Sequence, residues 1–212
     1  MIKIYSIILI NLLFISCIDL ITEEEFYESI HLKQSGWLEF YENNIEQNIS
    51  LGENFTFQLW FSGQDATNLD ASCILNINSD SLNLSIYKNQ NAANHLMIYI
   101  NETLYDEIEI ENIDLNNENN FYLLSVIIEN QTMTIYFNST LIFEESINEI
   151  NDSQIIVGAL KIENSISNLW HGYVDEIRLW NDALTSDIIE FHNQYPYKVS
   201  SSYDDEYLDY LV

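Results

Sequence analysis

The stretch of sequence that decides the fold is WHGYVDEIRLWNDALT, at residues 170–185. Apolar and polar residues alternate over residues 173–180, which is typical of a β-strand with one buried face. Residues 185–192 follow with a capping hydroxyl and an early acid, and Pro196 lies beyond their end. These features favour a helix, because the hydroxyl can cap its first N–H groups and the acid suits its dipole. The stretch therefore predicts a final strand followed by one short helix.

The same alternation recurs in short runs along the chain before this stretch. The runs cover residues 37–41, 55–61, 73–77, 82–87, 95–100, 105–110, 121–128, 132–137, 140–143 and 155–157. Asparagine-rich turns separate several of them, and asparagine tolerates left-handed backbone, so it can replace glycine, of which the chain has only 5. Strands without intervening helices predict an all-β fold, an antiparallel β-sandwich or jelly roll with one short C-terminal helix.

The composition is that of a folded and strongly acidic domain. The 212 residues include 34 Asp and Glu against 6 Lys and Arg, which gives a formal net charge of -28. Hydrophobic residues make up 47% and aromatic residues 13%, which is enough for one core, so we expect one folded domain instead of a disordered acidic chain. The charge makes nucleic acid and anionic lipid surfaces poor partners.

The N-terminal segment predicts export. Residues 1–16 combine one lysine with an apolar run that is too short to span a bilayer, which is typical of a cleaved signal peptide. The segment ends in Leu-Phe-Ile-Ser before Cys17, which resembles a bacterial lipobox. The resemblance implies a lipid on Cys17 that anchors the protein at the outer membrane or cell surface. An ordinary secretory signal cleaved near Ser16 is the alternative.

These features divide the chain into four parts. We expect a signal peptide at residues 1–16, a lipid-anchored tether at 17–30, the sandwich domain at 31–196 and an acidic C-terminal tail at 197–212. A lipid on Cys17 would leave Cys73 without a disulfide partner. Because Cys73 lies in an apolar strand run, we predict that it is a buried free thiol.

Residues 170–185 also resemble the C-terminal signature of the laminin-G-like and pentraxin-like jelly rolls of the concanavalin A type. The matching positions are Trp170, Gly172, Val174, Asp175, Glu176, Ile177, Arg178, Trp180, Asn181, Ala183 and Leu184. Weaker matches to the family lie earlier in the chain, in the family's order, at residues 37–40, 53–61 and 121–142. The resemblance implies a non-catalytic binding or adhesion module that recognises an extracellular glycan or glycoprotein.

The chain also departs from that family. The family's two Asp-Gly turns are Glu129-Asn130 and Asn138-Ser139 here, and its Trp-His pair is Phe121-Tyr122. The Asp-Gly-x-Asp loop that commonly follows the opening strand is missing as well. Since a fold does not fix a ligand, a surface scaffold that binds a partner protein is an alternative function.

A catalytic alternative comes from residues 107–111, Glu-Ile-Glu-Ile-Glu, which resemble the catalytic strand of laminarinase-type glycoside hydrolases. Alternation would place Glu107, Glu109 and Glu111 on one strand face, with Glu107 and Glu111 as the carboxylate pair that retaining hydrolysis needs. The middle acid is Glu instead of the family's Asp, and the family's preceding Trp-Pro and Gly are missing. We therefore interpret these glutamates as a solvated strand face and expect no enzyme activity.

Calcium is the cofactor that the resemblance implies, because many members of this jelly-roll group hold a structural Ca²⁺. Its predicted ligand is Asp175, which matches the signature Asp of the family. The alternative is that backbone amides or Arg178 satisfy this carboxylate.

Aromatic side chains that could stack on sugars are the remaining candidates for a ligand site. They are Trp60, Trp170, Trp180, Tyr87 and Tyr99. Aromatic residues in strands more often belong to the core, so the sequence does not identify the ligand-binding residues.

Overall fold

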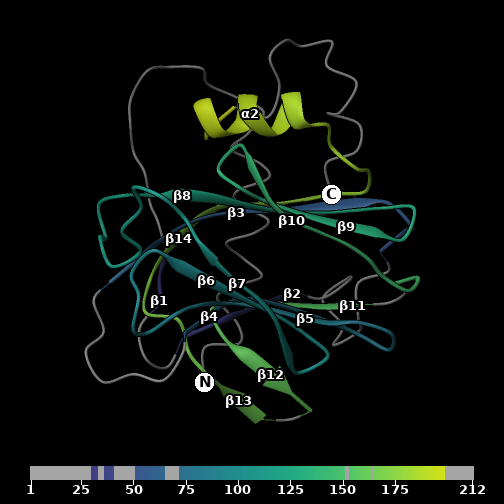
Figure 1. Cartoon of the computed structure of the whole chain (residues 1–212), viewed down its shortest axis with the longest axis horizontal. Coiled ribbons are helices and arrows are strands. Elements are labelled where there is room, and N and C mark those ends of the chain that lie inside the picture. The colour runs from purple at the N-terminus through teal and green to yellow at the C-terminus, as the bar shows by residue number, and fades with distance from the viewer. Residues whose placement is uncertain are drawn as a thin grey trace.

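The computed structural model describes residues 30–32, 36–40, 51–64, 72–150, 153–163 and 165–198. Within these residues, two six-stranded antiparallel sheets pack face to face, and one helix lies outside the sandwich (Figure 1). Sheet A contains, in spatial order, β1 (Ile30–Leu32), β14 (Gly172–Trp180), β3 (Phe55–Gly63), β8 (Tyr122–Glu129), β9 (Thr132–Phe137) and β10 (Thr140–Ser146). Sheet B contains β2 (Leu38–Phe40), β11 (Ser153–Val157), β4 (Ser72–Ser79), β5 (Asn83–Lys88), β6 (His95–Ile100) and β7 (Thr103–Glu109). The predicted antiparallel β-sandwich is confirmed.

Alternation along the strands places one face of each sheet in a shared core. On β3, Phe55, Phe57, Leu59 and Phe61 are at most 1% exposed and belong to the main core cluster. Phe57 meets Phe40 of sheet B edge-on, with 6.3 Å between the ring centroids. Burial of each such side chain contributes roughly 1.5–3 kcal/mol, so this interface is the main source of stability.

Asparagine supplies the left-handed backbone of the tight hairpins, as the sequence predicts. Asn130 and Gln131, with φ of 49° and 65°, join β8 to β9 between the paired residues Glu129 and Thr132. Asn138, with a φ of 54°, begins the next turn. Two-residue hairpins favour positive φ because its twist matches that of the strands.

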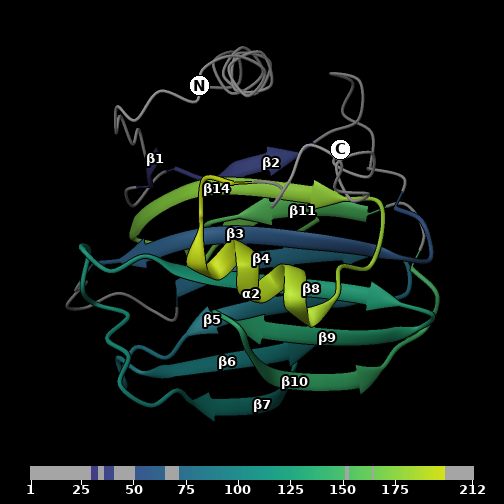
Figure 2. The ribbon, with the colours of Figure 1, turned by 90° about the horizontal axis from the view of Figure 1, so that it is seen from above.

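The helix α2 (Ser186–Gln194) covers the outer face of sheet A, as Figure 2 shows. A second cluster of buried side chains joins the helix region to the sheet, and it contains Trp60, Leu123, Ile127, Trp180, Leu184 and Ile189. Asp187 lies in the first turn as expected, but the N-cap residue Thr185 makes no side-chain cap hydrogen bond. The predicted capping role of the Thr185 hydroxyl is therefore wrong, and apolar packing holds the helix in place.

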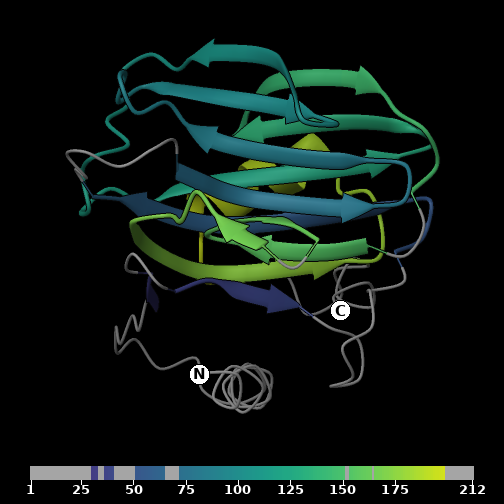
Figure 3. The ribbon, with the colours of Figure 1, turned by 90° about the horizontal axis from the view of Figure 1, so that it is seen from below.

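Three very short strands were not predicted. The hairpin of β12 (Leu160–Ile162) and β13 (Ser165–Ser167) lies across the outer face of sheet B (Figure 3). In β1, Ile30 pairs with Val174, so the expected tether over residues 17–30 is wrong at its last residue. A three-residue strand is too short for alternation to reveal it.

The remaining segment predictions fall on other parts of the chain. The predicted signal peptide, Cys17 and the acidic tail from residue 199 onward lie outside the described residues. Within the described residues, α2 is too short and too polar to cross a bilayer.

Candidate functional site

One end of the sandwich is shaped by the loop between β7 and β8, which packs directly on the end of β3. The close approach requires a glycine, because a Cβ on Gly63 would stand 2.0 Å from the carbonyl oxygen of Leu115. Leu115 is fully buried, and its N–H donates to the carbonyl of Ala93 at 2.7 Å. Gly63 and Leu115 together fix where this loop lies.

Polar side chains stabilise the turn of this loop. The Asp114 carboxylate accepts the N–H of Asn116 at 3.0 Å, and the carbonyl of Asp114 accepts the N–H of Asn117 at 3.1 Å. The Tyr122 hydroxyl donates to the same carbonyl at 3.2 Å. A side chain that forms a hydrogen bond with the backbone two residues later is typical of an ordered turn. The backbone of this loop is therefore ordered and holds the polar side chains in defined positions.

A hollow of about 500 Å³ opens between this loop and the end of β3. We call it the loop-end hollow, and its lining consists of Gln64, Asp114, Asn116, Asn117 and Glu118. The Gln64 amide donates to the Glu118 carboxylate, and the buried ammonium of Lys88 donates to the amide oxygen of Asn116. These contacts tie the loop to Gln64, directly after β3, and to Lys88 at the end of β5.

The lining offers carboxylate acceptors together with amides that both donate and accept hydrogen bonds. This combination suits a ligand that carries several hydroxyl groups, since each hydroxyl also donates and accepts. The described side chains of the lining include no aromatic ring, so stacking on a sugar face is not part of this site.

None of the five lining residues stands out in the sequence, where the segment before residues 121–128 is only one of the asparagine-rich turns. The signal that could have found the site is Gly63. In a chain with 5 glycines, a glycine at the end of a buried strand indicates a place that another backbone approaches closely.

Asp175 lies at a β-bulge in β14. Asp175 pairs with Trp60 and Arg178 pairs with Gln58, so two residues of β14 stand opposite the single Leu59. The Asp175 carboxylate accepts the N–H of Glu176 at 2.8 Å, and Glu176 has a φ of 42°. The extra residue keeps Asp175 and Arg178 on the same outer face of sheet A.

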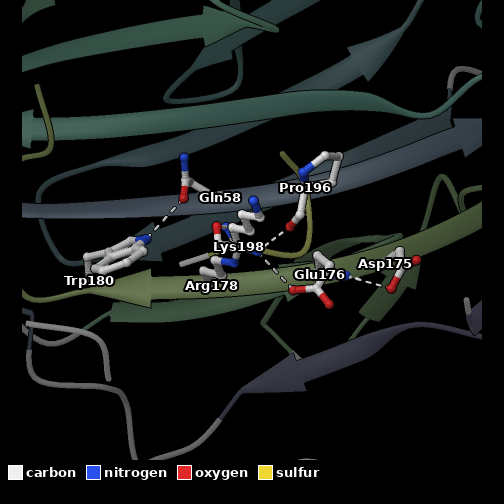
Figure 4. Close-up of polar contacts among 7 residues, drawn as sticks. All are labelled: Gln58, Asp175, Glu176, Arg178, Trp180, Pro196 and Lys198. Carbon is white, nitrogen blue, oxygen red and sulfur yellow. Dashed lines mark hydrogen bonds and ion pairs between the residues drawn. The ribbon is translucent and has the colours of Figure 1, made fainter. Parts of the chain in front are cut away.

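Arg178 connects this outer face to the segment that follows α2. Its guanidinium lies 4.7 Å from the Trp60 ring centroid. It pairs with Glu176 at 3.1 Å and donates to the carbonyls of Pro196 and Lys198 (Figure 4). Asp175 lies on the far side of Glu176 from Arg178 (Figure 4). The hydrogen bonds of Arg178 thus go to Glu176 and to backbone carbonyls, and its charge also acts on Asp175.

Burial raises the pKa of the Asp175 carboxyl. The negative charge of Glu176 adds to the rise, whereas the Glu176 N–H and the Arg178 guanidinium oppose it. The sequence offered backbone amides or Arg178 as partners of this carboxylate. The structure shows a hydrogen bond from a backbone amide, the N–H of Glu176.

The residues around Asp175 fit a calcium ion poorly. Ca²⁺ takes roughly six to eight oxygen ligands, but the nearest acid, Glu176, is paired with Arg178. Among the described residues, no group of three or more His, Cys, Asp or Glu side chains is arranged to hold a metal. The calcium prediction at Asp175 therefore rests on the family resemblance alone.

The aromatic candidates are mostly core residues. Trp60, Trp170, Trp180 and Tyr87 are 4%, 1%, 0% and 6% exposed, and only Tyr99 is partly accessible. Trp180 donates its indole N–H to the buried Gln58 amide oxygen at 3.0 Å and stacks on His192 (Figure 4 shows the hydrogen bond). Four of the five candidates thus hold the sandwich together.

The three glutamates that resembled a glycosidase strand do not share one strand. β7 ends at Glu109, so Glu111 lies beyond it and the predicted common face is wrong for that residue. Glu107 accepts a hydrogen bond from Asn89 at 2.6 Å and Glu109 accepts one from Asn94 at 3.1 Å, and both glutamates are exposed. This arrangement resembles a solvated edge strand more than a catalytic cleft.

Cys73 is fully buried in β4 and unbonded to another cysteine, as predicted. Burial raises the pKa of its thiol, which removes the thiolate form that reacts.

Comparison with known proteins agrees with this architecture. Residues 34–190 match the laminin G family model described as the concanavalin A-like lectin/glucanases superfamily, and the chain belongs to that superfamily. Comparison with curated proteins gave no match.

Solved structures show the same fold at low sequence identity. The native heptameric SAP-like pentraxin from Limulus polyphemus is 15% identical with a TM-score of 0.54, over 87% of this chain and 89% of that chain. NanB sialidase from Streptococcus pneumoniae, as its K499G mutant, is 16% identical with a TM-score of 0.53, over 76% of this chain. The chain spans only 27% of that sialidase chain, so the likeness covers only a part of that protein. These neighbours share the jelly-roll fold of this chain.

Proposed function

We propose that this protein is an exported, lipid-anchored and non-catalytic module that binds an extracellular glycan or glycoprotein through the loop-end hollow. The observation that carries the proposal is the hollow itself, about 500 Å³ and lined by amides and carboxylates on a hydrogen-bonded loop. Membership of a lectin-containing superfamily supports a carbohydrate as the ligand. The hollow lies on the loops of the sandwich, where binding residues are often found.

The charge of the protein narrows the class of glycan. A net charge of -28 repels sulfated and uronic polymers at low salt, unless a cation such as Ca²⁺ bridges them. Neutral glycans are therefore favoured. A single shallow site without stacking should bind weakly, and clustered lipid-anchored copies would compensate by avidity.

A glycan array tests the ligand class. The purified protein is applied to neutral, sulfated and uronic glycans, with Ca²⁺ and with chelator. Binding to neutral glycans is the expected result. If no glycan on the array binds and a pull-down recovers one stoichiometric surface-protein partner, the function is that of a scaffold that binds a partner protein instead of a glycan.

The lipid anchor rests on the lipobox-like sequence before Cys17. Cys17→Ala should abolish labelling by a radioactive or alkyne fatty acid and release an exported soluble form. Labelled, membrane-bound Cys17→Ala protein would exclude lipidation at this cysteine.

A further inference from the structure

A second and smaller hollow lies on the outer face of sheet A, beside the segment that follows α2. It measures about 80 Å³ and is lined by Trp60, Phe121, Asp175, Glu176, Asn193, Pro196 and Tyr197. It shares no residue with the loop-end hollow. We call it the bulge hollow, because Asp175 and Glu176 of its lining lie at the bulge in β14.

The carboxylate of Asp175 is the charged group with spare bonding capacity in this hollow. It receives one hydrogen bond, from the N–H of Glu176, although an ionised carboxylate can accept about four. Arg178 pairs with Glu176 and also opposes the rise of the Asp175 pKa, so one guanidinium faces two carboxylates and the three groups leave one net negative charge. A half-buried carboxylate of this kind favours a cationic partner.

Aromatic rings form much of the remaining wall. Phe121 and Tyr197 are 41% and 49% exposed, whereas Trp60 is buried and the Arg178 guanidinium already lies over its ring. Large aromatic side chains that stay exposed beside a carboxylate attract cations, because the face of each ring is negative. The amide oxygen of Asn193 adds a neutral acceptor.

The size of the hollow limits what can enter. About 80 Å³ is small for a ligand pocket, and it suits a compact group such as CH₂–NH₃⁺ better than a whole pyranose ring. A primary ammonium has three donors and no acceptor, which matches the carboxylate oxygens of Asp175 and the amide oxygen of Asn193. Ca²⁺ would find too few oxygen ligands here.

We propose that the bulge hollow binds the ammonium group of a lysine side chain on a partner protein. The inference goes beyond glycan recognition and is independent of it, because the two hollows have separate linings. An acidic module that presents a lysine-accepting hollow is suited to docking on a basic protein surface.

The test measures binding of a lysine tripeptide, acetyl-Gly-Lys-Gly-amide, by amide and indole chemical shifts of the purified protein. The controls are the Nε-acetylated tripeptide, n-butylammonium and a chitosan oligomer. Asp175→Asn removes the charge but keeps an oxygen for the Glu176 N–H. Asp182→Asn is its matched control, since Asp182 accepts the N–H of Ala183 at the same 2.8 Å and does not line the hollow.

The lysine tripeptide should shift the indole N–H of Trp60, and its acetylated form should not. Asp175→Asn should weaken binding about tenfold, whereas Asp182→Asn should leave it unchanged. Equal binding of both tripeptides, or full binding to a folded Asp175→Asn protein, would overturn the proposal. If n-butylammonium or chitosan binds but the lysine tripeptide does not, the assignment to a protein lysine would be overturned.

Discussion

Gly63 lies beneath the carbonyl of Leu115, so close that a Cβ at position 63 would stand 2.0 Å from that oxygen. This contact joins the end of β3 to the loop that lines the loop-end hollow. The shape of the candidate site therefore depends on a residue without a side chain. The first prediction follows from it.

Gly63→Ala should displace the β7–β8 loop and destabilise the fold, by roughly 1–3 kcal/mol or more, because backbone must move to admit the methyl group. Thermal unfolding measures this loss. Gly52→Ala is the control, since its Cβ would find no atom closer than 3.8 Å. If the two variants melt at the same temperature, the loop is not held as described.

The hydrogen bond between Trp180 and Gln58 gives the second prediction. Gln58 is fully buried, accepts from the Trp180 indole and donates to the Ser125 hydroxyl at 3.3 Å. Gln58→Met keeps the side-chain length but leaves those partners unpaired, which should cost about 1–3 kcal/mol in denaturant unfolding. The exposed Gln194→Met serves as control, and an equally small loss in both would show that the buried bond contributes little.

Asp175 should affect stability in a pH-dependent way. Burial raises its pKa in the folded state, so the folded state binds the proton more tightly than the unfolded state does. The contribution of this carboxyl is therefore present at low pH and is lost as pH rises through the folded pKa. Relative to Asp175→Asn, the wild type should gain stability as pH falls from neutral into the acid range. A constant difference across that range would contradict this sign.

Asp175→Ala differs from Asp175→Asn because it also removes the acceptor of the Glu176 N–H. It should lower the free energy of unfolding by about 1 kcal/mol relative to Asp175→Asn.

Thermal unfolding of the wild type and of Asp175→Ala, with and without a chelator, checks the calcium prediction. A melting temperature that falls on chelation in the wild type, but not in Asp175→Ala, would support a Ca²⁺ ligand there.

Cys73 should resist thiol reagents in the native protein. In a Cys17→Ala background it is the one remaining cysteine of the 2 in the chain. Because the thiol is buried and its pKa is raised, labelling should be slow before unfolding and reach one equivalent after it. Rapid labelling of the native protein would place Cys73 at the surface.

The sequence predicts the sandwich well because its signals are local. Alternation over residues 55–61 gives β3, and positive-φ asparagines such as Asn130 and Asn138 give the hairpins. The candidate site was missed because it is not local. Gln64 and Glu118 meet only after β3 and the β7–β8 loop have packed together, and no periodicity records that contact. The prediction that Glu107 and Glu111 share a strand face was wrong although its signal is local. Their spacing suggested one strand, but β7 ends at Glu109, before Glu111.

The loop-end hollow as a glycan site is the central claim, and the affinity of one lining variant tests it most directly. The neutral glycan with the strongest array signal is titrated calorimetrically into wild type, Glu118→Gln and the exposed control Glu144→Gln. Loss of a charge-assisted hydrogen bond predicts binding about tenfold weaker for Glu118→Gln, with Glu144→Gln unchanged. Equal affinity in all three proteins would contradict the claim and place the glycan elsewhere on the sandwich.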